Sequence, residues 1–210
     1  MKKLFAIVTV SLAGLAAFAQ GKIGFNNDSL HLVYWGPGPF AGQAVNSDNI
    51  PLGIPGLAVD LYMGTSSSLL YLYSSATFGP LAIGPGKWTS VSVQANANPT
   101  TGAPAIPGGT TAFVQVAVLS TERPAPNVFD PAAFQTFILA GFSTEFTFTL
   151  GGPITYPPMW GANGNWPAGT WPMDQYGIGS RGAITFMPEP SAGILLGLGA
   201  AAMLLFSRRR

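Results

Sequence analysis

The sequence of 210 residues contains no cysteine, a single histidine and few charged residues, which make up 8% of the chain. Without cysteine, the chain has no disulfide, no thiolate metal ligand and no cysteine nucleophile. The lone His31 would have to be the base of any Ser-His-Asp triad, yet no Gly-x-Ser-x-Gly segment positions a serine. The sequence therefore predicts a protein that is not an enzyme, with no catalytic residue, no metal site and no cofactor.

Positive charge is concentrated at the two ends of the chain. The formal net charge is +1, but residues 20–187 carry four basic and seven acidic side chains, a net charge of −3. A mildly acidic body has no basic stripe that could neutralise nucleic-acid phosphates. We therefore expect no nucleic-acid partner.

The N-terminus has the three parts of a bacterial signal peptide. Two lysines precede an apolar stretch over residues 4–18, and the small residues Ala17 and Ala19 form an Ala-x-Ala cleavage site. The stretch is too short and wrongly flanked for an ordinary membrane span. We expect residues 1–19 to direct export through the Sec translocon, and signal peptidase to cut before Gln20.

The C-terminus ends in a second apolar segment. Ser191 to Phe206 are sixteen residues without a charge, followed by Arg208, Arg209 and Arg210. At ~1.5 Å per residue, a helix of this length reaches ~24 Å, and arginine stems can extend it towards the ~30 Å of a hydrocarbon core. The sequence predicts a transmembrane helix with its arginines in the cytoplasm and the body outside the inner membrane.

The motif before this span carries a family resemblance. Pro188, Glu189 and Pro190, followed by the apolar span and the arginine cluster, resemble the PEP-CTERM sorting signal of Gram-negative bacteria. The resemblance implies a sorting tail over residues 188–210 that an exosortase recognises and cuts, in hosts that make exopolysaccharide and biofilm. Geometry alone also allows a permanent single-pass anchor whose helix start is marked by proline.

Short strands separated by turns dominate the body, residues 20–187. Aromatic residues make up 12% of the chain, while 27 glycines and 19 prolines supply turns. Alternating or β-branched segments predict seven strands. They are Lys22–Phe25, Leu57–Met63, Leu69–Tyr73, Trp88–Gln94, Ala112–Leu119, Thr144–Leu150 and Ala183–Phe186. The fold class expected is all-β, an antiparallel β-sandwich that is jelly-roll-like or Ig-like.

Two of these segments show which residues face the core. In Leu57–Met63 the residues at odd positions are apolar and face inward, and the face of Ala58, Asp60 and Tyr62 is expected to lie outside the core. In Thr144–Leu150 the inward residues are Phe146, Phe148 and Leu150. One soluble helix is predicted over Pro131–Leu139, with Asp130 as its N-terminal cap.

The body also resembles secreted proteins that carry this sorting signal in Verrucomicrobia-like bacteria. The segments that carry the resemblance are Gly21–Asn27, Ala58–Gly64, Ser75–Phe78 and Ala112–Val118. It implies export and a β-rich fold, and it transfers no catalytic residue.

A cluster of aromatic residues lies near the end of the body. Trp160, Trp166 and Trp171, with Tyr176 close behind, occupy a segment rich in glycine and proline. These rings are candidate glycan-binding residues, because flat apolar faces stack on sugars. The alternative is that they fold back as a lid over one end of the body.

Three functions are consistent with these observations. The first is an exported cell-surface or extracellular-matrix protein with a structural role in biofilm, whose partners are the Sec translocon, signal peptidase, an exosortase and exopolysaccharide. The alternative is a carbohydrate-binding module that uses the loop tryptophans. The third is an exported glycosidase, which would need two carboxylates facing one cleft.

Overall fold

The computed structural model describes residues 20–36, 40–80, 84, 86–152, 154–160, 164–166 and 171–172. The predicted signal peptide, the predicted strand Ala183–Phe186 and the predicted sorting tail lie outside these residues. In the described part of the chain, no helix is long and apolar enough to cross a membrane. Nearly all regular structure there is β-strand, so the prediction of an all-β fold is confirmed.

The largest sheet, the main sheet, is antiparallel and has two ten-residue strands at its centre. Of these, β3 (Leu57–Ser66) pairs with β4 (Leu69–Thr77) along one edge and with β6 (Thr111–Ser120) along the other. The far edge of β6 pairs with two short strands, β7 (Ala140–Phe142) and β8 (Phe146–Thr149). The order of strands in the main sheet is thus β4-β3-β6, with β7 and β8 sharing the far edge, and the chain leaves this sheet between β4 and β6 to form a strand of another sheet.

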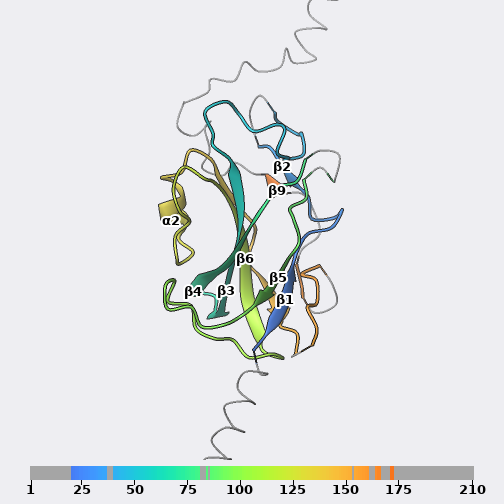
Figure 1. Cartoon of the computed structure of the whole chain (residues 1–210), viewed down its shortest axis with the longest axis vertical. Coiled ribbons are helices and arrows are strands. Elements are labelled where there is room, and N and C mark those ends of the chain that lie inside the picture. Colours follow the sequence, from blue (N-terminus) through green and yellow to red (C-terminus); the bar gives the residue numbers. More distant parts are fainter. Residues whose placement is uncertain are drawn as a thin grey trace, which may run out of the picture.

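A second, smaller layer faces the main sheet (Figure 1). Strand β1 (Lys22–Phe25) pairs antiparallel with β5 (Val91–Gln94). Near one end of the molecule, β2 (Val33–Tyr34) pairs with β9 (Trp171–Pro172). This last pair is parallel, which the expected antiparallel pattern did not include.

Apolar side chains from the two layers meet in the space between them. The residues of β3 and of Thr144–Leu150 that were predicted to face the core are all buried, so that prediction is confirmed. Period-two alternation identified them because one face of each strand lies against the other layer. Core residues include Ile23, Phe25, Leu57, Val59, Leu61, Met63, Val93, Val114, Val116, Val118, Phe146, Phe148 and Leu150.

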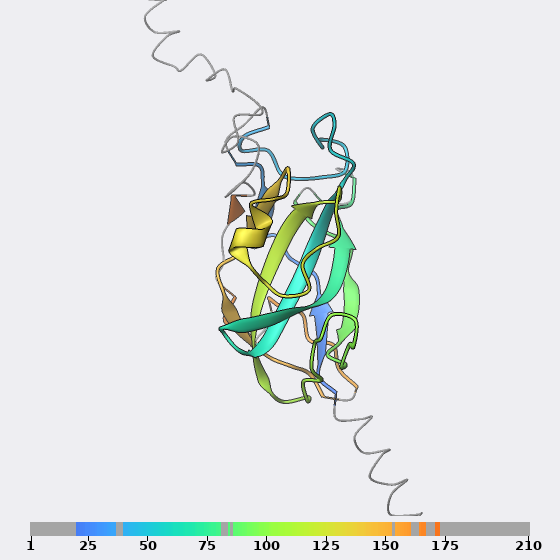
Figure 2. The ribbon, with the colours of Figure 1, turned by 90° about the vertical axis from the view of Figure 1, so that its left-hand side faces the viewer.

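The opposite side of the main sheet, its outer face, is covered as well. The sequence predicted Asp60 and Tyr62 to lie outside the core, but Tyr62 is fully buried and Asp60 is 1% exposed. The segment after β6, which includes the short helix α2, lies over this face (Figure 2). A second apolar cluster forms beneath it, made of Tyr62, Leu70, Ala117, Leu119, Phe134, Phe137 and Ala140.

Aromatic contacts and backbone hydrogen bonds fix this covering segment. The Tyr62 hydroxyl donates to the Pro126 carbonyl at 2.9 Å. The Phe129 ring meets Phe134 edge-on, with ring centroids 5.0 Å apart. The Phe129 N–H donates to the Leu70 carbonyl at 2.8 Å, which attaches the segment to β4. The prediction that only one face of β3 is buried was wrong because these partners lie some sixty residues away in sequence.

The predicted helix begins where expected and ends early. Helix α2 spans Pro131–Phe134, and Asp130 accepts a hydrogen bond from the Ala132 N–H at 2.9 Å as its cap. Beyond Phe134, the chain turns back and Leu139 bonds to Ser120 at the end of β6. Residues 135–139 thus form turns and bends between α2 and β7 instead of the predicted helix.

Candidate functional site

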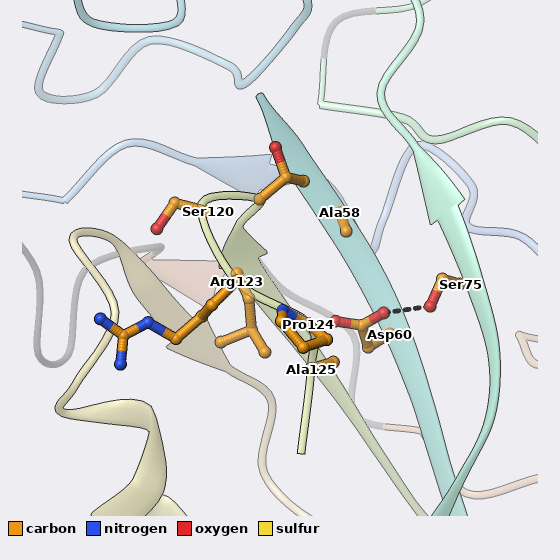
Figure 3. Close-up of a pocket in the computed structure, with 9 residues that line it drawn as sticks. Ala58, Asp60, Ser75, Ser120, Arg123, Pro124 and Ala125 are labelled. Carbon is orange, nitrogen blue, oxygen red and sulfur yellow. Dashed lines mark hydrogen bonds between the residues drawn. The ribbon is translucent and has the colours of Figure 1, made fainter. Parts of the chain in front are cut away.

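A cavity of about 280 Å³ opens on the outer face of the main sheet. Its floor is formed by β3, β4 and the end of β6, and the segment that follows β6 forms its rim (Figure 3). Ala58, Leu119, Pro124 and Ala125 supply apolar walls, and Asp60 is the one carboxylate among the lining residues. We call this cavity the Asp60 pocket.

Asp60 is held at the centre of the sheet by the pairing of its strand. It lies opposite Ser75 on β4 and opposite Ala117 on β6. The Ser75 hydroxyl donates a short hydrogen bond to Asp60 Oδ1. Asp60 Oδ2 is buried and has no hydrogen-bond partner. A buried oxygen without a partner lowers the stability of the folded protein, because burial removes the water that would otherwise donate a hydrogen bond to it.

The surroundings of Asp60 favour its protonated form. Burial raises the pKa of Asp60 to about 6, although the hydrogen bond from Ser75 opposes the shift. Arg123 lines the pocket, but its guanidinium lies over the Phe137 ring, 5.5 Å from the centroid, and points away from Asp60 (Figure 3). Burial and the neighbouring charge of Asp60 also raise the pKa of Tyr62, so this hydroxyl stays protonated as a donor.

These features define what the pocket can do chemically. One carboxylate lines it, whereas glycoside hydrolysis needs a pair of carboxyl groups on either side of the scissile bond. An unpartnered carboxylate oxygen in an apolar cavity instead accepts hydrogen bonds from a bound group. The geometry therefore suits binding rather than hydrolysis.

Asp60 was not predicted to be a site residue from the sequence. The available signal was an acidic residue inside an otherwise apolar strand, Ala58-Val59-Asp60-Leu61-Tyr62. Acidic residues are seldom fully buried, so such a position is ordinarily read as solvent-facing. Only the covering segment, distant in sequence, turns this position into the floor of a pocket.

His31 lies in a second polar cluster, away from this pocket. Its buried ring places Nδ1 2.5 Å from Asp28 Oδ1 and stacks on Trp166 with centroids 4.2 Å apart. Burial opposes ionisation of Asp28, but hydrogen bonds from His31 and the Leu30 N–H outweigh it and lower the Asp28 pKa. Asn27 donates to the His31 carbonyl at 2.8 Å. This network fixes the loop and suits a structural role for His31.

Two of the four candidate glycan-binding residues, Trp160 and Trp166, have described side chains, and these differ in exposure. Trp166 is 7% exposed and stacks on Phe146 as well as on His31, so it has no free face for a sugar ring. Trp160 is 43% exposed. The side chain of Trp171 and all of Tyr176 lie outside the described residues. Trp166 is thus part of the core, and Trp160 has an exposed side chain that a ligand could reach.

Metal ligands and relatives give no further indication of function. Among the described residues, no group of three or more histidine, aspartate or glutamate side chains could hold a metal ion. Comparisons with protein-family models, curated proteins and solved structures gave no match. The assignment of function therefore rests on the sequence motifs and on the geometry described above.

Proposed function

We propose that the chain is an exported cell-surface or extracellular-matrix protein of the PEP-CTERM type. Its body is a β-sandwich, jelly-roll-like or Ig-like, with a structural and non-enzymatic role in a biofilm or exopolysaccharide matrix. Residues 1–19 bring it to the Sec translocon, and the helix of the tail holds it in the inner membrane in transit. An exosortase then cuts near Pro188, Glu189 and Pro190 and releases the body to the cell surface.

The observation that carries this proposal is that Gln20 and Gly21, the two residues directly after the expected cleavage site, are bonded into the body. Gln20 forms a bridge with Pro107, and the Gly21 N–H donates to the Ile106 carbonyl at 2.7 Å. A Cβ at Gly21 would lie 2.5 Å from Leu150 Cδ1, so this part of the chain is packed tightly against the body. Cleavage before Gln20 would leave all of these contacts intact, as expected where a signal peptide is joined directly to the mature protein.

The residues of the sorting motif suit recognition by a protease. Proline on both sides of Glu189 disfavours helix and keeps the motif extended, as a protease substrate should be.

Substitution of the motif tests the proposed sorting. Alanine at Pro188, Glu189 and Pro190 together should leave an uncut chain in the inner-membrane fraction of the bacterial host. Met187→Ala, a single change next to the motif, should leave release of the body unchanged. If the triple variant is cut and released like the wild type, exosortase sorting through this motif is wrong.

Carbohydrate binding is a second candidate function, supported by the exposure of Trp160. Ile154, in the same loop region, is 88% exposed, so apolar surface is available there. Titration with host exopolysaccharide should shift the intrinsic fluorescence of the wild type, and Trp160→Ala should abolish the shift. Leu52→Ala, at a fully exposed apolar side chain elsewhere in the chain, is the control. An unchanged response of the Trp160→Ala variant would remove this candidate.

A further inference from the structure

We propose that the Asp60 pocket binds a primary ammonium group carried on a short aliphatic stem. This site is independent of the export and sorting proposed above. It rests on a buried acceptor, on the charge and shape of the cavity around it, and on the hydrogen bonds that the neighbouring polar groups already make.

The two serine hydroxyls that line the pocket are already used in hydrogen bonds. Ser75 donates to Asp60 Oδ1, which leaves Oδ2 without a donor. Ser120 also lines the pocket, but its hydroxyl donates to the Leu139 carbonyl at 3.2 Å and accepts the Leu139 N–H at 3.0 Å. Asp60 Oδ2 is therefore an acceptor that a bound ligand can use.

Charge decides which donor fits best. Arg123 is the one cation among the lining residues, and it lies over Phe137 instead of pairing with Asp60. Hydrogen bonds between ions are stronger than those between neutral groups, and a low-dielectric site strengthens them further. An ammonium group supplies both the missing donor and the missing positive charge, whereas a hydroxyl supplies the donor alone.

The walls and size of the pocket define the rest of the ligand. Ala58, Leu119, Pro124 and Ala125 offer aliphatic surface, and none of the lining residues is aromatic, so a sugar ring finds no stacking platform. The cavity of 280 Å³ holds about nine water molecules at ~30 Å³ each. That volume suits a short alkylamine or the end of a lysine side chain, and it is too small for an oligosaccharide.

Ionisation of Asp60 couples binding to pH. Two neighbouring residues carry a titratable or charged group, namely Tyr62 on the same strand, which stays protonated, and Arg123 in the segment above. Ser75 of β4 and Ser120 of β6 do not titrate. Because the pKa of Asp60 is about 6, the ionised fraction falls about tenfold from pH 7 to pH 5. Affinity for an ammonium ligand should fall by the same factor.

Calorimetric titration of the full-length chain in detergent tests the inference. At pH 7, 1-aminobutane should bind at least tenfold more tightly than 1-butanol, which has the same stem and no charge. Nα-acetyl-lysine-N-methylamide distinguishes the source of the ammonium group. Binding of both amines indicates any alkylamine, and binding of the lysine derivative alone indicates a protein side chain; either result supports the site.

Two variants and the pH series make the test decisive. Asp60→Asn keeps the shape of the side chain and should weaken amine binding at least tenfold, while Asp48→Asn, the same change in an exposed loop, should leave it unchanged. The tenfold loss between pH 7 and pH 5 is measured on the wild type and needs no variant to fold. Equal affinity for 1-butanol and for the amine that binds, a flat pH series with that amine, or no binding of either amine at pH 7 would overturn the inference.

Discussion

Replacing the buried acid by its neutral isostere should change how the stability of the protein depends on pH. Asp60 is 1% exposed, and burial raises its pKa from 3.8 to about 6. This difference in pKa between the folded and the unfolded state corresponds to about 3 kcal/mol of unfolding free energy. The Asp60→Asn variant removes this ionisable group and keeps an oxygen that accepts the Ser75 hydrogen bond.

The direction of the change in stability follows from whether the folded or the unfolded state binds the Asp60 proton more tightly. Because the folded state has the higher pKa, ionisation of Asp60 costs no stability well below pH 3.8, where both states are protonated. The cost grows as pH rises from 3.8 to 6 and is fully present above that. The wild type therefore loses stability through this window, and the variant lacks that loss.

Urea unfolding of both proteins at pH 4, 5, 6 and 7 measures the effect. The unfolding free energy of Asp60→Asn minus that of the wild type should increase by about 2 kcal/mol between pH 4 and pH 7. The difference between the two proteins isolates Asp60, because all other titrating groups are shared. Asp48→Asn controls for the change in net charge. If the unfolding free energies of Asp60→Asn and the wild type change in parallel with pH, burial does not raise the pKa of Asp60.

Four further substitutions test the packing and the cap of α2. Trp166→Ala should cost about 3–5 kcal/mol of unfolding free energy because its ring is packed in the core, whereas Trp160→Ala should cost less than about 1 kcal/mol; thermal unfolding of both should reveal the contrast. Gly64→Ala should cost about 1–3 kcal/mol in urea unfolding, since the new Cβ would lie 2.1 Å from the Leu69 carbonyl oxygen; an unchanged midpoint would contradict this contact. Asp130→Ala should lower stability by about 1 kcal/mol through loss of the α2 cap, and an equal stability would show that the cap contributes nothing.

Local alternation was enough to find most of the strands. Lys22–Phe25 was predicted with its observed bounds, and Ala112–Leu119 is one residue shorter than β6 at each end. Trp88–Gln94 was predicted too long, because Trp88 bridges Phe78 and its indole donates to the Phe25 carbonyl at 3.3 Å. Strand interiors follow from side-chain period, and their ends depend on partners elsewhere in the chain.

The candidate site could not be predicted in the same way. The outer face of the main sheet carries Asp60 and Tyr62, and it is buried only because the segment around Phe129 and α2 returns over it. Nothing in the alternation of β3 encodes that contact. The same holds for Trp166, whose neighbours His31 and Phe146 come from distant parts of the sequence.

The most direct test of export and sorting is the intact mass of the protein recovered from its bacterial host, with its terminal peptides mapped. The account predicts a chain that begins at Gln20, ends near Pro188 to Pro190 and is found outside the inner membrane. A chain that keeps Arg208 to Arg210 and stays in the inner membrane would contradict it, and would make the protein a permanently anchored one.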